Sequence, residues 1–320
     1  MKHRLTALIT AAATAALSAA ITAEALSVKT GGSTLTYEVV SGYDDLLTDG
    51  ITGAAEITGM SDPPEALVIP AYAETGQESL VFAAVGEKAF MGLTNVTSVS
   101  FPDTIVSIGD SAFAGCLALE RVTLPASVTN IGVKVFVSCS QLKYADLGAE
   151  GSKLKAIPEN CFSSCTNLTE VRMPEGLVGI GKEAFYGCTS LRSVTVPSTV
   201  QFIGENAIGL RTNRVNNMIE PVPGFIIFGK KGTAAESYAK GKGIDFIDTE
   251  ATPAGDVNMD VFVDSSDASL VLSEYADLAT GGKSSFTAAQ RFLADVDKSG
   301  ETDSSDASQI LIIYAENATA

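Results

Sequence analysis

Phenylalanine recurs at nearly constant intervals through the middle of this 320-residue chain. The recurring positions are Phe90, Phe113, Phe136, Phe162 and Phe185, with three equal intervals and one longer one. A period of about 23 residues is typical of a solenoid, in which each repeat forms one coil that stacks on the next. One such coil cannot bury an apolar face alone, but stacked coils share a continuous core. The spacing therefore predicts a solenoid between Val85 and Ile208.

Other residue types keep the same phase. Each unit has the pattern L-x-x-V-x-V-P followed by V-x-x-I-G-x-x-A-F-x-x-C, as in the segment from Leu119 to Cys139, where Val135 replaces the alanine. The isoleucines of this pattern are Ile108, Ile131, Ile157, Ile180 and Ile203, and the glycines are Gly109, Gly132, Gly181 and Gly204. One longer repeat has its insertion near residues 148–152.

These repeats resemble the leucine-rich repeats of bacterial surface antigens. The resemblance implies a mainly β leucine-rich-repeat solenoid with short strands, over residues 67–247. Where standard leucine-rich repeats have an inward asparagine, this chain has Thr104, Ser127, Gly176 and Thr199. Because the family is functionally diverse, the resemblance predicts the fold better than the ligand.

If the L-x-x-V-x-V segments are strands, their outward residues form a candidate ligand face. Its charged and aromatic members are Arg121, Tyr144, Glu170, Arg172 and Arg192, among mostly small hydroxyl residues. Such a face favours a polar protein interface over sugar stacking, because Tyr144 is its one aromatic residue and the chain has no tryptophan. Binding of a soluble glycan and a merely solvated face remain open alternatives.

Capping segments are expected at both ends of the solenoid. Residues 26–66 include an alternating stretch, Leu35, Tyr37 and Val39, that predicts a strand-rich N-terminal cap. At the other end, residues 234–239 have the pattern of a short helix and residues 244–247 that of a final strand. Residues 248–254 are expected to be a linker.

The C-terminal part of the chain contains one segment twice. DVNMDVFVDSSDASLVLSEY begins at Asp256, and DVDKSGETDSSDASQILIIY begins at Asp295. In each copy, oxygen-bearing side chains occur at loop positions 1, 3, 5, 9 and 12, the spacing with which a short loop surrounds a hard divalent cation. Calcium is the metal that fits this spacing.

The expected ligands correspond between the two loops, with a backbone carbonyl at position 7. The first set is Asp256, Asn258, Asp260, Phe262, Asp264 and Asp267, and the second is Asp295, Asp297, Ser299, Glu301, Asp303 and Asp306. Position 12 is aspartate where the EF-hand motif has glutamate. The first loop has the better ligands, but Met259 and Val261 stand in its turn, whereas Gly300 suits the turn of the second.

An apolar helical pattern follows each loop, and no matching helix is expected ahead of either. A duplicated calcium loop with a following helix resembles a dockerin, here over residues 255–320. The resemblance implies two bound Ca²⁺ ions and docking onto a cohesin domain of a scaffoldin in a cellulosome-type complex that degrades plant polysaccharide. It also implies cohesin contacts at Ser265, Ser266, Ser304 and Ser305. The alternative, an acidic solvated tail, does not explain two loops of equal length.

Residues 1–25 have the features of a secretory signal peptide. Lys2, His3 and Arg4 precede an apolar alanine-rich stretch, and A-x-A ends at Ala25. With no second long apolar run, we expect a secreted, extracellular protein without membrane insertion, held at the cell surface or in a cellulosome through its scaffoldin. The net charge is −17, and residues 255–320 contribute nine of these negative charges, which disfavours nucleic-acid binding.

His3 is the only histidine, so the mature chain has none. This excludes Ser-His-Asp and Cys-His nucleophile pairs and zinc sites that use imidazole, although paired carboxylates of the glycosidase type remain possible. Of the five cysteines, Cys116, Cys139, Cys165 and Cys188 occupy one position of the repeat and Cys161 another. At such apolar positions we expect small buried hydrophobes rather than disulfides or catalytic thiols.

Three functions remain after these exclusions. The first is a non-catalytic interaction protein, in which the repeat face binds a protein or cell-surface ligand and the dockerin binds its scaffold. The second is an accessory component or enzyme of polysaccharide catabolism of the glycoside hydrolase type, but the chain lacks room for a further domain of more than about 100 residues. The third makes the solenoid a spacer or an inhibitor-like accessory.

Overall fold

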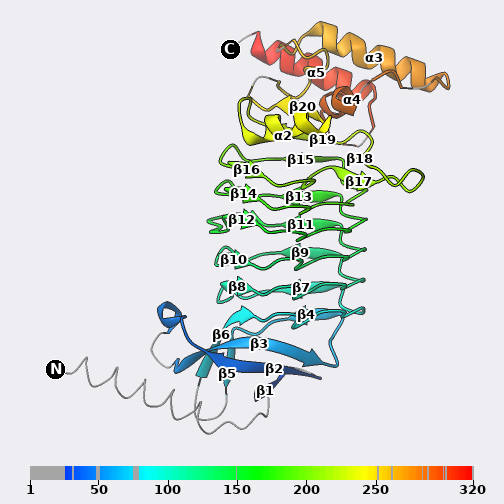
Figure 1. Ribbon diagram of the computed structural model, residues 1–320. Helices are drawn as coiled ribbons and strands as arrows, with labels where there is room; N and C mark the ends of the chain where they lie inside the picture. Colours follow the sequence, from blue (N-terminus) through cyan, green and yellow to red (C-terminus); the bar gives the residue numbers. More distant parts are fainter. Residues whose placement is uncertain are drawn as a thin grey trace.

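The structure, a computed structural model, describes residues 26–30, 32–47, 51–74, 79–148, 150–250, 252–260, 262–282, 284–286, 288–297, 299 and 301–318. The expected signal peptide therefore lies outside the described residues, as do Val261 and Gly300 of the loop turns. Figure 1 shows a column of stacked coils with a sheet across its N-terminal end and a group of helices at its C-terminal end. A mainly β solenoid followed by a helical region is the predicted fold class.

Two ladders of short parallel strands run along the column. The first ladder joins β4 (Ala66–Val68), β7 (Ser98–Ser100), β9 (Arg121–Thr123), β11 (Tyr144–Asp146) and β13 (Glu170–Arg172). The first ladder continues along the column with β15 (Ser193–Thr195), β19 (Ile226–Gly229) and β20 (Asp245–Asp248), which are hydrogen-bonded to one another as a separate sheet. The second ladder begins with β8 (Ser107–Ile108) and β10 (Asn130–Ile131), which continue the N-terminal sheet, and goes on with β12 (Ala156–Ile157), β14 (Gly179–Ile180) and β16 (Phe202–Ile203), which form a separate sheet.

The repeated phenylalanines form a continuous stack inside the column. The centroids of successive rings are 5.1, 5.5, 5.2 and 5.3 Å apart from Phe90 to Phe185. The first pair is inclined by 27° and the last by 1°, so the rings become more nearly parallel along the column. The repeat period thus places one large apolar side chain of each coil on that of the preceding coil, and this stack is the centre of the core.

The cysteines form a second column beside the phenylalanines. All five are free and buried. Each thiol of the repeated position donates a hydrogen bond to the carbonyl oxygen of a phenylalanine in the preceding coil, for example Cys139 Sγ to Phe113 O at 3.2 Å and Cys188 Sγ to Phe162 O at 3.1 Å. The expectation of small buried hydrophobes is confirmed, and each thiol also satisfies a buried carbonyl.

The repeated glycines mark the places where consecutive coils approach most closely. A Cβ atom on Gly109 or Gly181 would lie 2.6 Å from the backbone nitrogen of Glu87 or Glu159 in the preceding coil. Since the conflicting atom belongs to the backbone, no rotamer change could relieve it. Glycine therefore recurs at this position because of coil spacing.

An antiparallel sheet covers the first coil. It contains β1 (Leu26–Thr30), β2 (Ser33–Val40) and β3 (Gly53–Ser61), and β3 pairs in parallel with β6 (Ser79–Val85). A short 3-10 helix, η1 (Asp44–Leu46), and β5 (Tyr72–Glu74) flank it. The alternation noted in the sequence directs Leu35 and Tyr37 inward, where the Tyr37 ring meets Phe82 edge-on at 5.4 Å.

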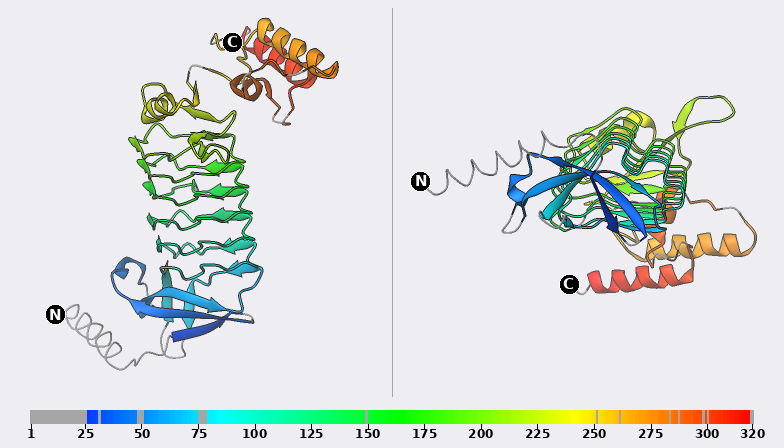
Figure 2. Two further views of the ribbon diagram at one scale, coloured as in Figure 1. Left: turned by 45° about the vertical axis from the view of Figure 1, so that its right-hand side comes forward. Right: turned by 90° about the horizontal axis from the view of Figure 1, so that it is seen from below.

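The other end of the solenoid has two departures from the repeat. A hairpin of β17 (Leu210–Thr212) and β18 (Ile219–Pro221) projects from the column (Figures 1 and 2). Helix α2 (Ala234–Lys242) then precedes β20. This helix is longer than the expected residues 234–239, and it ends at Gly243, whose φ of 66° suits glycine.

Three helices follow the solenoid: α3 (Ser265–Ala279), α4 (Ala288–Ala294) and α5 (Ser304–Asn317). Helices α3 and α5 lie side by side and run in opposite directions, and α4 lies between them and β19 and β20 (Figures 1 and 2). The prediction that no helix precedes either loop is wrong for the second loop, because α4 ends directly before Asp295. A seven-residue helix is too short to give a clear apolar period. Among the described residues, no helix is long and apolar enough to span a membrane.

Candidate functional site

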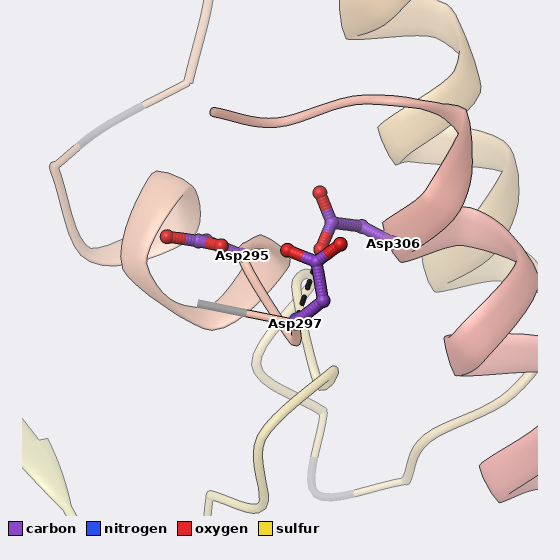
Figure 3. Close-up of side chains that lie close together, drawn as sticks. All are labelled: Asp295, Asp297 and Asp306. Atoms are coloured by element: carbon purple, nitrogen blue, oxygen red, sulfur yellow. Dashed lines mark hydrogen bonds between the residues drawn. The ribbon is translucent and has the colours of Figure 1, made fainter. Parts of the chain in front are cut away.

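The second acidic loop brings three of its expected ligands together. Oxygen atoms of Asp295, Asp297 and Asp306 all lie within 4.8 Å of one another. Figure 3 shows the three carboxylates converging from the end of α4, the loop and the start of α5. Oxygens that share one Ca²⁺ at about 2.3 to 2.6 Å can be at most about 5 Å apart, so this cluster has the size and the hard-oxygen chemistry that calcium requires.

Asp306 organises the second loop. Its Oδ1 accepts hydrogen bonds from the backbone N–H groups of Val296 at 2.8 Å and Asp297 at 3.2 Å, and its Oδ2 accepts one from Asp303 N at 3.0 Å. Asp303 is the N-cap of α5, and Asp306 completes its capping box. The aspartate at position 12 therefore ties the start of the loop to the start of the helix.

The first loop has the same network. Asp267 Oδ1 accepts from Val257 N at 2.8 Å and Asn258 N at 3.0 Å, and its Oδ2 accepts from Asp264 N at 2.9 Å. Asp264 caps α3 in the same capping box. The two copies of the duplicated segment thus fold into one loop conformation, and position 12 holds both ends of each loop.

Hydrogen bonds between residues two positions apart in the chain shape the middle of both loops. Position 3 accepts from the N–H of position 5, as Asn258 Oδ1 does from Asp260 N at 2.9 Å and Asp297 Oδ1 does from Ser299 N at 2.9 Å. The turn of the first loop takes a positive φ of 61° at Met259. A side chain thus closes the turn between positions 3 and 5 in both loops.

Three of the loop carboxylates are shielded from solvent. Asp256, Asp267 and Asp306 are completely buried. Hydrogen bonds from the Ser266 side chain and backbone hold the pKa of Asp264 below its usual value, and those from Ser299 lower the pKa of Asp297. Burying several negative charges is unfavourable unless a cation or hydrogen-bond donors compensate them, and the backbone donors do so only in part. The donor set of the second loop, where three carboxylates converge, therefore fits a divalent cation.

The two loops are not equally assembled. Within the described part of the chain, only the second loop brings three acidic side chains to within metal-ligand distance. In the first loop Asn258, Asp260 and Phe262 are exposed, whereas Asp256 and Asp267 are buried. The expected ligand at position 5 of the second loop, Ser299, has its hydroxyl within 3.2 Å of the Glu301 carbonyl, to which it donates.

The four serines expected at the docking surface are exposed at the N-terminal ends of α3 and α5. Two apolar residues repeat on each helix with nearly equal exposure. Leu272 and Leu311 are 45% and 43% exposed, and Tyr275 and Tyr314 are 42% and 44% exposed. The two helices therefore share these serine, leucine and tyrosine positions, whereas the exposed Ile312 of α5 corresponds to Ser273 of α3.

The candidate ligand face lies on the first strand ladder. Arg121, Tyr144, Glu170 and Arg172 lie on adjacent strands in register, and the Arg121 guanidinium lies over the Tyr144 ring, 4.4 Å from its centroid. Asp146 is in register with the exposed Thr123 and Arg172 but is itself buried, because Tyr144 Oη and Gly148 N donate to it and Arg172 lies 3.7 Å away.

Arg192 lies just ahead of its strand. Its Nη1 donates to the carbonyl oxygens of Thr189 at 3.4 Å and Pro223 at 3.5 Å. It therefore supports the neighbouring loops more than it extends the ligand face.

Sequence reasoning missed a groove at the end of this face. It has a volume of about 690 Å³ and lies between β13, β15 and the start of the second loop, with Glu170, Arg172, Thr195, Phe292 and Asp295 among its lining residues. No sequence pattern identifies this groove, because it forms between strands of the repeat and a dockerin segment that shares no repeat with them.

Both regions match known families. Residues 83–212 match the BspA type leucine rich repeat region in six copies, and residues 254–312 match the dockerin type I domain. The chain therefore contains a BspA-type leucine-rich-repeat region followed by a dockerin type I domain, and both predicted resemblances are confirmed. Among curated proteins, none matches the chain.

Solved structures with similarity to this chain are bacterial leucine-rich-repeat proteins. A leucine rich cell surface protein from Faecalibacterium prausnitzii is 22% identical, with a TM-score of 0.39, and the match covers 66% of each chain. The T. pallidum leucine rich repeat protein is 23% identical with a TM-score of 0.30, over 43% of this chain and 83% of that one. A third, from Eubacterium ventriosum, is 22% identical with a TM-score of 0.34, over 45% and 42%.

Proposed function

We propose that this chain, with its leucine-rich-repeat region and its dockerin, is a secreted non-catalytic docking protein. Its dockerin holds one Ca²⁺ in each loop and binds a cohesin of a scaffoldin in a cellulosome-type complex. Its repeat face binds a protein or a cell-surface ligand. The observation that carries the proposal is the identical hydrogen-bond network of the two loops, centred on Asp267 and Asp306.

Calcium has a definite role in this proposal. The ligands would be the loop carboxylates, with Asn258, Ser299 and the carbonyls of Phe262 and Glu301. The ion would compensate the buried charges and hold each loop to the first turn of its helix. Helices α3 and α5 would then be fixed in the arrangement that a cohesin recognises.

The repeated surface of α3 and α5 supports docking in two orientations. A half-turn would exchange Ser265 and Ser266 with Ser304 and Ser305, and Leu272 with Leu311. Because the exposures of Leu272 and Leu311, and those of Tyr275 and Tyr314, differ by only two percentage points, either helix offers a partner the same leucine and tyrosine contacts. One dockerin could therefore bind one cohesin through either helix.

The test is calcium calorimetry on the full chain, followed by capture of purified type I cohesins in calcium and in chelator. We expect heat from two ions and capture only in calcium. Replacing Ser265 and Ser266 by aspartate should leave capture largely intact, as should the same change at Ser304 and Ser305, whereas the quadruple variant should lose it. Val215→Asp, on the hairpin and 96% exposed, is the matched control for added charge.

Loss of capture in either double variant would show one docking orientation. Absence of calcium heat, or capture that persists in chelator, would contradict the proposed function. Catalysis is not part of the proposal, since leucine-rich repeats and dockerins are non-catalytic domains.

A further inference from the structure

The outward side of the first ladder changes character near its C-terminal end. On β15 the outward residues are Ser193 and Thr195. In register with them, β19 has Ile226 and Phe228, and Phe228 pairs with Ile247 on β20. The polar ladder face thus becomes apolar over its last two strands.

Helix α4 of the dockerin covers this apolar end. Ala289 and Leu293 form one buried cluster with Ile226, Phe228 and Ile247. The five side chains are between 2% and 7% exposed. The Phe292 ring lies against the Phe228 ring with centroids 4.3 Å apart. Closely packed apolar side chains of this kind hold two segments in one relative position.

A backbone contact fixes the same place. Gly255 N donates to Leu293 O at 2.9 Å, and this bond joins the residue before the first loop to the last turn of α4. The second loop begins at Asp295, immediately after α4. The first loop is therefore joined to α4 through the hydrogen bond of Gly255, and the second loop continues directly from the end of α4.

Helix α4 packs on two sides. Ala294, the last residue of α4, and Phe286, which lies just ahead of the helix, belong to the core of the dockerin with Val257, Val271 and Ile310. Ala289 and Leu293, four residues apart, belong to the cluster on the ladder. A spacing of four residues places Ala289 and Leu293 on one side of α4, whereas Ala294 packs into the dockerin core, so α4 is shared between the two cores.

We propose that the dockerin is the C-terminal cap of the repeat domain, and that calcium binding in the dockerin stabilises the solenoid through α4. The last coil of a solenoid needs a cover for its apolar surface, which here is provided by α4. The link to calcium rests on the proposed function, whereas the capping contact stands on the packing alone. A second consequence is that the column extends from its scaffold in a fixed direction, with α3 and α5 on the side of α4 away from the ladder (Figure 1).

The experiment compares the full chain with Phe292→Ala, Phe228→Ala and the double variant, in calcium and in chelator. Phe292 is half exposed and outside the dockerin core, so its truncation leaves both domains able to fold. Phe202→Ala, an exposed phenylalanine on β16, is the matched control. The measurements are the thermal midpoint of the β-sheet signal and amide hydrogen exchange in β19 and β20.

In the unaltered chain and in Phe202→Ala, calcium should raise the midpoint and slow exchange in β19 and β20 by about tenfold or more. Each interface variant should lose most of this response while it binds calcium with affinity within about threefold of the parent. The double variant should behave like either single variant. This non-additivity should also appear in chelator if a contact between the two rings persists there.

If calorimetry reports bound ions but calcium changes neither the thermal midpoint of the solenoid nor the exchange in β19 and β20, the inference is overturned and the proposed function stays intact. If calorimetry reports no calcium, the proposed function fails, and the double-variant comparison without calcium then decides the capping contact by itself. If the losses of stability from Phe292→Ala and Phe228→Ala simply add up in the double variant without calcium, the capping contact is excluded.

Discussion

Asp267 and Asp306, at position 12 of the first and second loops, accept hydrogen bonds from the same three positions of their respective loops. Both side chains are completely buried. A carboxylate in this position does two things at once. It satisfies the backbone at the start of a helix, and it provides negative charge where the loop would hold a cation.

Asp267→Asn and Asp306→Asn should therefore each weaken one calcium site. The amide keeps the size of the side chain but removes its charge and one acceptor oxygen. We expect the calcium affinity of the altered loop to fall roughly tenfold or more, which is about 1.4 kcal/mol of binding free energy, and that of the other loop to change little. Calorimetry should resolve one retained and one weakened site in each variant. Asp277→Asn, exposed on α3 and outside both loops, is the control, and equal loss at both sites would indicate that the loops bind as one unit.

The buried thiols predict a loss of stability at alkaline pH. Burial raises the pKa of Cys116 to about 11 and that of Cys188 to about 12, and it also raises the pKa values of Cys139, Cys161 and Cys165. The folded state therefore keeps protons that the unfolded state loses above about pH 9. Stability from this source is complete below that pH and decreases above it, by about 1.4 kcal/mol per pH unit for each thiol until its folded pKa is reached.

Denaturant unfolding between pH 8 and pH 10.5 would measure this slope. Cys188→Ala should make the decrease of the unfolding free energy with pH less steep by the contribution of one thiol, even though the variant is less stable at every pH. The native protein should also react with thiol reagents only as fast as it unfolds. An unchanged slope in Cys188→Ala would exclude the thiol as its source.

Glu274 is the buried carboxylate of α3 that no sequence pattern identified. Burial alone would raise its pKa, but hydrogen bonds outweigh burial, so that the pKa of Glu274 lies below its usual value. The donors are the hydroxyls of Ser284 and Ser285, with Ser285 N at 3.0 Å. Glu274 thus connects α3 to the segment that leads into α4.

Glu274→Gln should destabilise the dockerin by roughly 1.5 to 3 kcal/mol at pH 7. The variant loses hydrogen bonds to a charged carboxylate, and its amide NH₂ group faces the donors of Ser284 and Ser285. Since the folded pKa is lowered, the contribution of Glu274 is present above about pH 4.5 and is lost as the pH falls through the folded pKa. The difference between parent and variant should therefore shrink in acid. Helix unfolding followed at pH 7 and pH 3 measures it, and a difference that stays constant with pH would contradict the role of the charge.

Periodicity explains which parts of this structure were predictable. Phe113 and Phe136 recur in phase, so the sequence alone places them in one stack. Asp267 and Asp306 recur in phase as well, which identifies the loops before their hydrogen bonds are known. Features that occur once were missed: α4, the position of Phe292 against Phe228, and the burial of Asp146. These depend on contacts between segments that share no repeat, and the local pattern holds no record of such contacts.

One glycine of the repeat and one glycine of α2 allow a prediction with opposite signs. At Gly181 a Cβ atom would lie 2.6 Å from Glu159 N, so Gly181→Ala must separate two coils. At Gly241, within α2, no atom lies within 4 Å of the same added group. We expect Gly181→Ala to destabilise the solenoid by about 2 kcal/mol or more through strain, and Gly241→Ala to stabilise it by about 0.5 kcal/mol through helix propensity. Denaturant unfolding of both variants measures the two effects, and a neutral Gly181→Ala would mean that coil spacing is not what requires glycine in this column.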